Sequence, residues 1–214
     1  MKNAIGMILA VVMAIACVCF VQAAAAEQAD DEVLGGWEIP DSPEITEGIQ
    51  ALCGKAFEGL TGAVYTPAAL LATQTVAGTN YRILFLAAPA VPDAEETYAV
   101  GTLYEDLEGN VTLTDLQSSD VATNFYDLEG GWVQAECPVI TDDIREVFEN
   151  ALECLVGVDY QPIALLGSQT VAGTNYAIIC EATVVYPDAV PYYAIVYITE
   201  GLDGTAALLD IAAL

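Results

Sequence analysis

Residues 74–81 read QTVAGTNY, and the same eight letters stand at residues 169–176, 95 positions later. The same shift, continued without a gap over the flanking residues, gives roughly 36 identities in 82 aligned positions, far more than chance allows. A repeat of this length has the size of a domain rather than of a solenoid unit. The sequence therefore predicts two tandem domains, at residues 35–116 and 130–214, with residues 117–129 as the linker.

Each repeat begins with the pattern of one amphipathic helix. Apolar residues recur there at spacings of three and four, which places them on one helix face. They are Ile45, Ile49, Cys53, Ala56 and Leu60 in the first repeat, and Ile140, Ile144, Phe148, Ala151 and Leu155 in the second. Thr46 and Thr141 stand where N-cap residues are expected, and Gly62 and Gly157 are expected to close the two helices.

Four strands are expected after each helix. In the first repeat they are predicted at residues 67–76, 79–88, 98–106 and 111–116, with counterparts 95 positions later. In the second of these strands, apolar residues alternate with Arg82 and its neighbours, which predicts one buried face. One helix packed on one face of a four- or five-stranded antiparallel sheet buries both apolar surfaces. Each repeat is therefore predicted to be an α+β domain.

The composition narrows the classes of function. The 214 residues include 31 acidic and 4 basic side chains and no histidine, a net charge of −27. Nucleic acid is excluded as a partner, because affinity for phosphate backbones comes from Lys and Arg. The absence of histidine removes the commonest general base and the imidazole ligands of most catalytic zinc sites, which excludes most familiar enzymes but not all of them. We expect no enzyme activity and no cofactor. The 55% hydrophobic content is too high for a disordered chain.

The N-terminus reads as an export signal. Residues 4–21 are uncharged and apolar, Lys2 precedes them, and small residues follow. These are the parts of a secretory signal peptide, so we expect residues 1–26 to be removed and the protein to be secreted or at the cell surface. An apolar run of 18 residues also leaves an uncleaved membrane anchor open.

Four cysteines lie beyond the signal, at residues 53, 137, 154 and 180. Their spacing matches no metal site, so they are interpreted as structural. Cys53 stands on the apolar helix face, which predicts a buried thiol. A disulfide between Cys154 and Cys180 stays an open alternative, since export permits disulfides.

The two QTVAG sequences, at residues 74–78 and 169–173, fit the Q-x-V-x-G pattern of cystatins, the protein inhibitors of papain-like cysteine proteases. The order of elements agrees as well: a glycine near the start, a short strand at Trp37, one helix, and four strands with the motif on the first hairpin. Each repeat thus resembles a cystatin domain over almost its whole length. The resemblance implies reversible inhibition of papain-like proteases, without a catalytic residue.

The resemblance also implies a protease-binding wedge with three parts in each repeat. The first part is Gly35 or Gly36 in the first repeat, and Gly130 or Gly131 in the second. The second part is the hairpin of Gln74, Thr75, Val76, Ala77 and Gly78, and of Gln169, Thr170, Val171, Ala172 and Gly173. The third part, a Pro-Trp pair in many cystatins, is missing. Leu107 and Leu202 are the apolar residues at the equivalent turns.

The expected roles follow from the chemistry of these side chains. Val76 and its counterpart would supply apolar contact with the protease, and Gln74 could bond backbone groups on either side. Trp37 and Trp132 are expected to cover the core between helix and sheet rather than to contact a partner. Because the Pro-Trp pair is missing, a non-inhibitory secreted or surface-attached module for binding or adhesion stays open as the alternative function.

Overall fold

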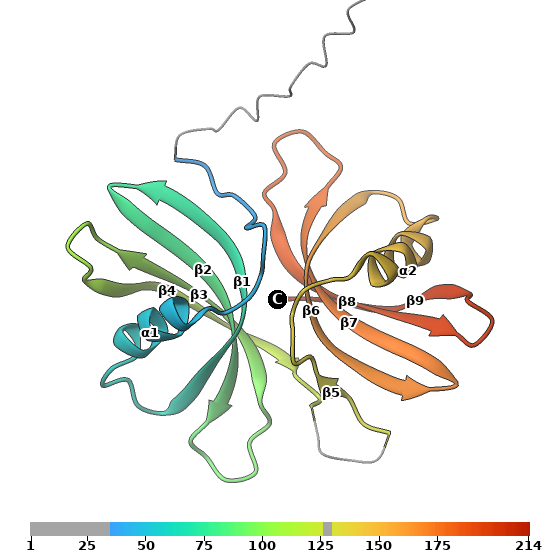
Figure 1. The fold of residues 1–214 in the computed structure, drawn as a ribbon, viewed down its shortest axis with the longest axis horizontal. Helices are drawn as coiled ribbons and strands as arrows, with labels where there is room; N and C mark the ends of the chain where they lie inside the picture. The colour runs from blue at the N-terminus through green and yellow to red at the C-terminus, as the bar shows by residue number, and fades with distance from the viewer. Residues whose placement is uncertain (1–34, 126–129) are drawn as a thin grey trace, which may run out of the picture. The chain divides into compact units, whose positions relative to one another are not determined.

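The computed structural model describes residues 35–125 and 130–214 (Figure 1). The signal peptide or anchor predicted at residues 1–26 lies outside the described residues, and so does the part of the expected linker at residues 126–129. Within the described ranges, no helix has the length and apolar character needed to cross a membrane. Both repeats belong to one compact unit of the chain.

The protein is α+β, with two helices and two antiparallel sheets of four and five strands. The first repeat contains α1 (Glu47–Ala56), β1 (Ala63–Val76), β2 (Gly78–Pro89), β3 (Thr97–Glu105) and β4 (Val111–Ala122), with the strands in that order in the sheet. The second contains β5 (Val133–Gln134), α2 (Asp142–Leu152), β6 (Val158–Val171), β7 (Gly173–Val184), β8 (Tyr192–Gly201) and β9 (Ala206–Ala213), again in chain order.

The repeat extends to the short pairing that precedes each helix. In the second sheet, β5 pairs Val133 with Ser168. The first repeat has an isolated bridge between Glu38 and Thr73, the two residues 95 positions earlier. The short strand expected at Trp37 is thus reduced to a single bridge one residue further on.

The helix starts are as predicted, and the helix ends are not. Thr46 Oγ1 accepts a hydrogen bond from the Ile49 amide at 3.3 Å, and Thr141 caps α2 in the same way. The prediction that Gly62 and Gly157 close the helices is wrong. α1 ends at Ala56, and the chain turns at Gly59 with a positive φ of 81° before it reaches Gly62. Leu60 and Leu155 consequently lie outside the helices and are exposed.

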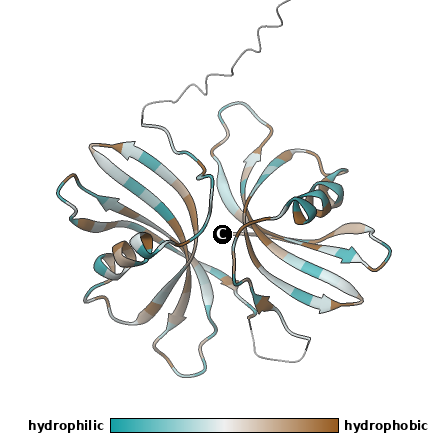
Figure 2. Ribbon diagram, viewed as in Figure 1, coloured by the Kyte–Doolittle hydropathy of each residue, from teal (hydrophilic) through white to brown (hydrophobic). Residues whose placement is uncertain are grey.

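The helix face of each sheet forms one core. In the first repeat, Ile49 and Cys53 of α1 pack on Ile83, Phe85 and neighbouring strand residues. In the second, Phe148 of α2 packs on the equivalent strand residues. Both helices carry hydrophobic and hydrophilic residues side by side, as elements with one buried face do (Figure 2). The burial predicted for Ile49, Cys53 and Phe148 is confirmed, whereas Leu60 and Leu155 do not belong to the helix face.

The opposite faces of the two sheets are buried as well, against each other. One continuous cluster joins Leu71, Leu84 and Tyr98 of the first sheet to Ile179 and Ile195 of the second. Leu84 and Ile179 are both 0% exposed. The alternation along β2 therefore identified one buried face correctly and missed the other. The layers run helix, sheet, sheet, helix.

The expected linker begins too early, because its first part is strand. β4 continues to Ala122, and Gln117 and Ser118 pair with Val100 and Ala99 of β3. Polar residues occur here because β4 is an edge strand whose side chains are partly exposed. After β4, Phe125 packs edge-on against Tyr98, with ring centroids 6.4 Å apart.

The cysteines are thiols, and the Cys154–Cys180 disulfide does not form in the described chain. Cys180 is fully buried in the helix-facing core of the second repeat, whereas Cys154 is exposed beyond the end of α2. Burial raises the pKa of the Cys53 thiol to about 11 and also raises that of Cys180.

These environments predict two classes of thiol reactivity. At about pH 8, Cys137 and Cys154 should react rapidly with a disulfide reagent, because their exposed sulfur atoms are accessible to it. Cys53 and Cys180 should react only after unfolding. Peptide mapping by mass spectrometry after a short exposure would measure this. Labelling of Cys180 in the native protein as fast as Cys137 would contradict it.

Candidate functional site

Both predicted binding turns of a repeat lie at the same end of its sheet. In the first repeat, β1 turns into β2 between Val76 and Gly78, and β3 turns into β4 between Glu105 and Val111. Thr79 pairs with Glu105, so the two turns stand beside each other. The second repeat has the same arrangement, with turns after β6 and after β8.

Glycine is required at the base of the first hairpin in both repeats. Gly78 has a φ of 125°, a conformation that other residues rarely adopt. A Cβ atom at Gly78 would also collide with the Glu105 carbonyl oxygen, and one at Gly173 with that of Glu200. The glycine thus lets the first hairpin lie tightly against the neighbouring strand.

The glutamine of each QTVAG sequence makes the same hydrogen bonds in both repeats. Gln74 Nε2 donates to the Gly35 carbonyl oxygen at 2.7 Å, and Asn80 Nδ2 donates to Gln74 Oε1 at 2.7 Å. In the second repeat, Gln169 makes the same bonds to Gly130 and Asn175, both at 2.9 Å. Each glutamine bonds within its own repeat and ties the N-terminal glycine to the hairpin. Its amide therefore holds the hairpin and the N-terminal segment together.

The structure separates the members of each glycine pair. Gly35 and Gly130 are exposed and accept the glutamine bonds. Gly36 and Gly131 are half-buried and follow them in the chain. Of the alternatives that the sequence left open, the first glycine of each pair is thus the one in contact with the hairpin.

Apolar side chains project from both turns. Val76 and Val171 at the first hairpin are 43% and 46% exposed, and the adjacent Thr75, Ala77, Thr170 and Ala172 are also exposed. At the second turns, Leu107 is 85% exposed and Leu202 is 88% exposed. Each repeat therefore presents two apolar tips at one end of the sheet.

The second turn is shaped by an aspartate in each repeat. Asp106 accepts hydrogen bonds from the Asn110 side chain and from the amides of Glu108 and Asn110, at 2.8 to 2.9 Å. These bonds, above all the one from the Asn110 side chain, lower the pKa of the Asp106 carboxyl. Asp203 has a lowered pKa for the same reason, with Thr205 as the donor. The exposed leucines are thus held on ordered turns.

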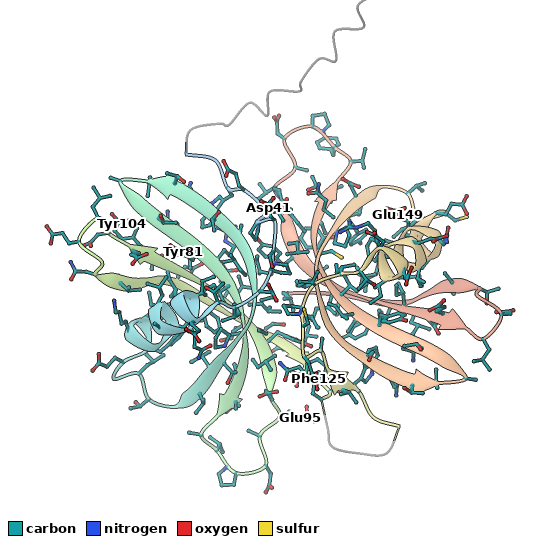
Figure 3. The ribbon with its side chains drawn as sticks, viewed as in Figure 1. Asp41, Tyr81, Glu95, Tyr104, Phe125 and Glu149 are labelled. Carbon is teal, nitrogen blue, oxygen red and sulfur yellow. The ribbon has the colours of Figure 1, made fainter. Side chains whose placement is uncertain are left out.

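One contact of the first hairpin was not predicted from the sequence. The Tyr104 hydroxyl donates to the Ala77 carbonyl oxygen at 2.5 Å and so braces the hairpin from β3 (Figure 3). The second repeat has Thr199 at the equivalent position, which has no phenol. No local pattern reveals this contact, because the two residues are 27 positions apart.

The expectation that Trp37 and Trp132 cover the cores between helix and sheet is wrong. Trp37 is 36% exposed and lies against the Arg82 guanidinium, whose carbon is 3.9 Å from the ring centroid. Trp132 packs on Tyr197 at 5.5 Å, beside the cluster between the two sheets. Both lie on the sheet face away from the helix.

Replacing Gly78 by alanine should therefore be costly. The positive φ and the collision with Glu105 predict a loss of about 2 kcal/mol or more in the free energy of unfolding. Gly109→Ala is a matched control, because Gly109 also has a positive φ but its Cβ would meet no atom within 4 Å. It should cost only about 1 kcal/mol. Urea denaturation would measure both, and equal losses would rule out the close approach.

No protein-family model matches the chain, and no curated protein matches its sequence. Among the described residues, no group of three or more His, Cys, Asp or Glu side chains is arranged to hold a metal ion.

Proposed function

We propose that the protein is an exported, reversible inhibitor of papain-like cysteine proteases, built from two cystatin-like repeats. The observation that carries the proposal is the meeting of three segments at one end of each sheet. An N-terminal glycine, the Q-x-V-x-G hairpin and a second turn converge there, and the Gln74 and Gln169 side chains hold the first two together.

The proposed mechanism is obstruction of the protease cleft. The apolar tips at Val76 and Leu107 enter the cleft and exclude substrate and water. The hairpin's glycine turn brings the backbone close without presenting a peptide bond in position for cleavage. Because the glutamine bond, the Tyr104 bond and the Asp106 turn already order these segments, little conformational entropy is lost on binding.

One observation favours a second candidate function. The second turns carry leucine where many cystatins carry a Pro-Trp pair, and a single exposed leucine is a weaker anchor than an aromatic side chain. A non-inhibitory surface module for binding or adhesion on the same scaffold would tolerate that loss. Capture of a partner that still binds when both hairpins are altered would favour this function.

A direct assay tests the proposal. The protein lacking residues 1–26 is mixed with papain, and hydrolysis of a small fluorogenic peptide is followed over a range of inhibitor concentrations. Residual activity should fall in a reversible, dose-dependent manner, while trypsin, which uses a serine nucleophile, should be unaffected. Full papain activity at tens of micromolar protein, roughly −6 kcal/mol of binding free energy, would contradict the proposed function.

A further inference from the structure

A cavity of about 480 Å³ lies beside Arg82, between the first sheet and the start of β8. Its polar lining comes from three neighbouring strands and from the second repeat. These residues are Arg82, Thr102, Asp115, Gln117, Ser118 and Tyr192. Arg82 pairs with Thr102, and Thr102 with Asp115, so the three follow one another across the sheet on a single face.

Among the residues that the structure describes, Arg82 is held in place without a counter-charge. Its guanidinium lies on the Trp37 ring on one side, and the Tyr193 ring is 6.0 Å away. No carboxylate oxygen of the described residues lies within 4.0 Å of it, although acidic side chains outnumber basic ones by 31 to 4 in the chain. Stacking immobilises the planar guanidinium and leaves its N–H edges able to grip a carboxylate with two parallel bonds.

A second buried polar group adjoins the guanidinium. The Tyr193 hydroxyl is buried and completes no hydrogen bond within the described chain, and the same is true of its counterpart Tyr98 in the first repeat. Burial raises the pKa of Tyr193, and the nearby Arg82 opposes that rise. Tyr193 also lines the cavity, so its hydroxyl is a further polar group beside the guanidinium.

The second repeat provides an internal comparison. The four positions equivalent to Arg82, Thr102, Gln117 and Ser118 are Ala177, Tyr197, Ala212 and Ala213. There, the Trp132 ring packs on Tyr197, and the cation is absent. Only the aspartate is shared, as Asp115 and Asp210. Between otherwise equivalent sheets, the first repeat alone combines a cation, hydroxyl and amide groups on this face.

We propose that the Arg82 cavity binds a small organic carboxylate. The ligand's carboxylate bonds the Arg82 guanidinium, and a hydroxyl or ammonium group on the same molecule donates to Asp115. One Asp115 oxygen accepts from Gln117 Nε2 at 2.8 Å, which fixes the carboxylate and leaves its other oxygen for the ligand. The volume lies within the range of small-molecule sites, roughly 300 to 1,000 Å³. This site is separate from the hairpin wedge and does not depend on the proposed inhibition.

The chain is well suited to a direct test, because its arginines are Arg82 and Arg145 alone. Their side-chain Nε–Hε signals in a ¹⁵N-correlated NMR spectrum can be assigned with Arg82→Lys. Sodium glutamate, sodium succinate and sodium chloride are titrated separately at constant ionic strength. Glutamate and succinate should shift the Arg82 signal to saturation, while Arg145 on α2 should not move and chloride should have no saturable effect.

Two variants identify the contacts. Arg82→Gln should weaken binding of both carboxylates by tenfold or more, about the value of a charged hydrogen bond. Asp115→Asn should weaken glutamate, which carries an ammonium group, more than succinate. Backbone amide spectra check that each variant is folded.

Several results would overturn the proposal. A shift of Arg82 that is linear, matched by Arg145 or reproduced by chloride would show nonspecific charge screening. If roughly 50 mM ligand leaves the Arg82 signal unmoved, the dissociation constant lies above the millimolar range of weak specific ligands. The guanidinium would then have only a structural role. Equal weakening of glutamate and succinate by Asp115→Asn would reject the second contact.

Discussion

The double variant Val76→Glu and Val171→Glu is expected to lose papain inhibition, with at least about a hundredfold weaker binding. Both valines project from the first hairpins and are nearly half exposed, so the substitution does not disturb a core. In the proposed complex, each new carboxylate would be buried in the protease cleft without a partner, which is strongly unfavourable. Dose–response curves against papain measure the loss.

The single variants should each leave one functional wedge. Arg82 lies close to the wedge end of the first sheet, and it faces Tyr193 at the start of β8, far from the turn after Gly201. The wedge end of one sheet therefore adjoins the opposite end of the other, and the two wedges point apart. We expect wild-type protein to bind two papain molecules and each single variant to bind one, as measured by light scattering after size exclusion.

A control variant separates the loss of hairpin contact with the protease from the effect of the added negative charge. Val64→Glu adds the same charge at the far end of β1, at a side chain that is 64% exposed and distant from the first hairpin. It should inhibit papain as the wild type does. If the double hairpin variant also inhibits normally, the hairpins do not contact the protease. If wild-type protein binds a single papain molecule, the two wedges do not act independently.

Much of each repeat could be predicted because its signals are local. The helix face, the Thr46 and Thr141 caps and the strand-to-strand turns each depend on residues a few positions apart. The duplication supplied every pattern twice. The helix ends were missed because Leu60 continues the apolar spacing although the chain has already turned at Gly59. Periodicity does not record where a helix stops.

Packing over long distances could not be predicted in the same way. The bond from Gln74 to Gly35 spans 39 residues, and its geometry depends on the isolated bridge before α1. The stacking of Trp37 on Arg82 has no signature in the sequence. The burial of both faces of β2 does have a signature in the sequence. Residues 83–87 are all apolar, as in strands covered on both sides. The alternation of larger side chains obscured it.

The packing of the two sheets against each other predicts a large loss of stability when a residue between them is truncated. Leu84→Ala should lower the free energy of unfolding by about 2 to 5 kcal/mol, the usual cost of emptying a buried leucine site. Leu84 is 0% exposed only because the second sheet covers it; on a separate repeat it would face water. There, the same substitution would cost less than about 0.5 kcal/mol. Urea denaturation followed by circular dichroism measures the difference.

Two further substitutions make the test specific. Ile83→Ala removes a residue that is also 0% exposed, but from the helix-facing core, and should be costly whether or not the sheets pack together. Val64→Ala, at an exposed site, should change stability by no more than about 0.5 kcal/mol. If Leu84→Ala behaves like Val64→Ala while Ile83→Ala is costly, the repeats fold as independent domains. If it behaves like Ile83→Ala, the two sheets share one core, and neither repeat should keep its full stability without the other.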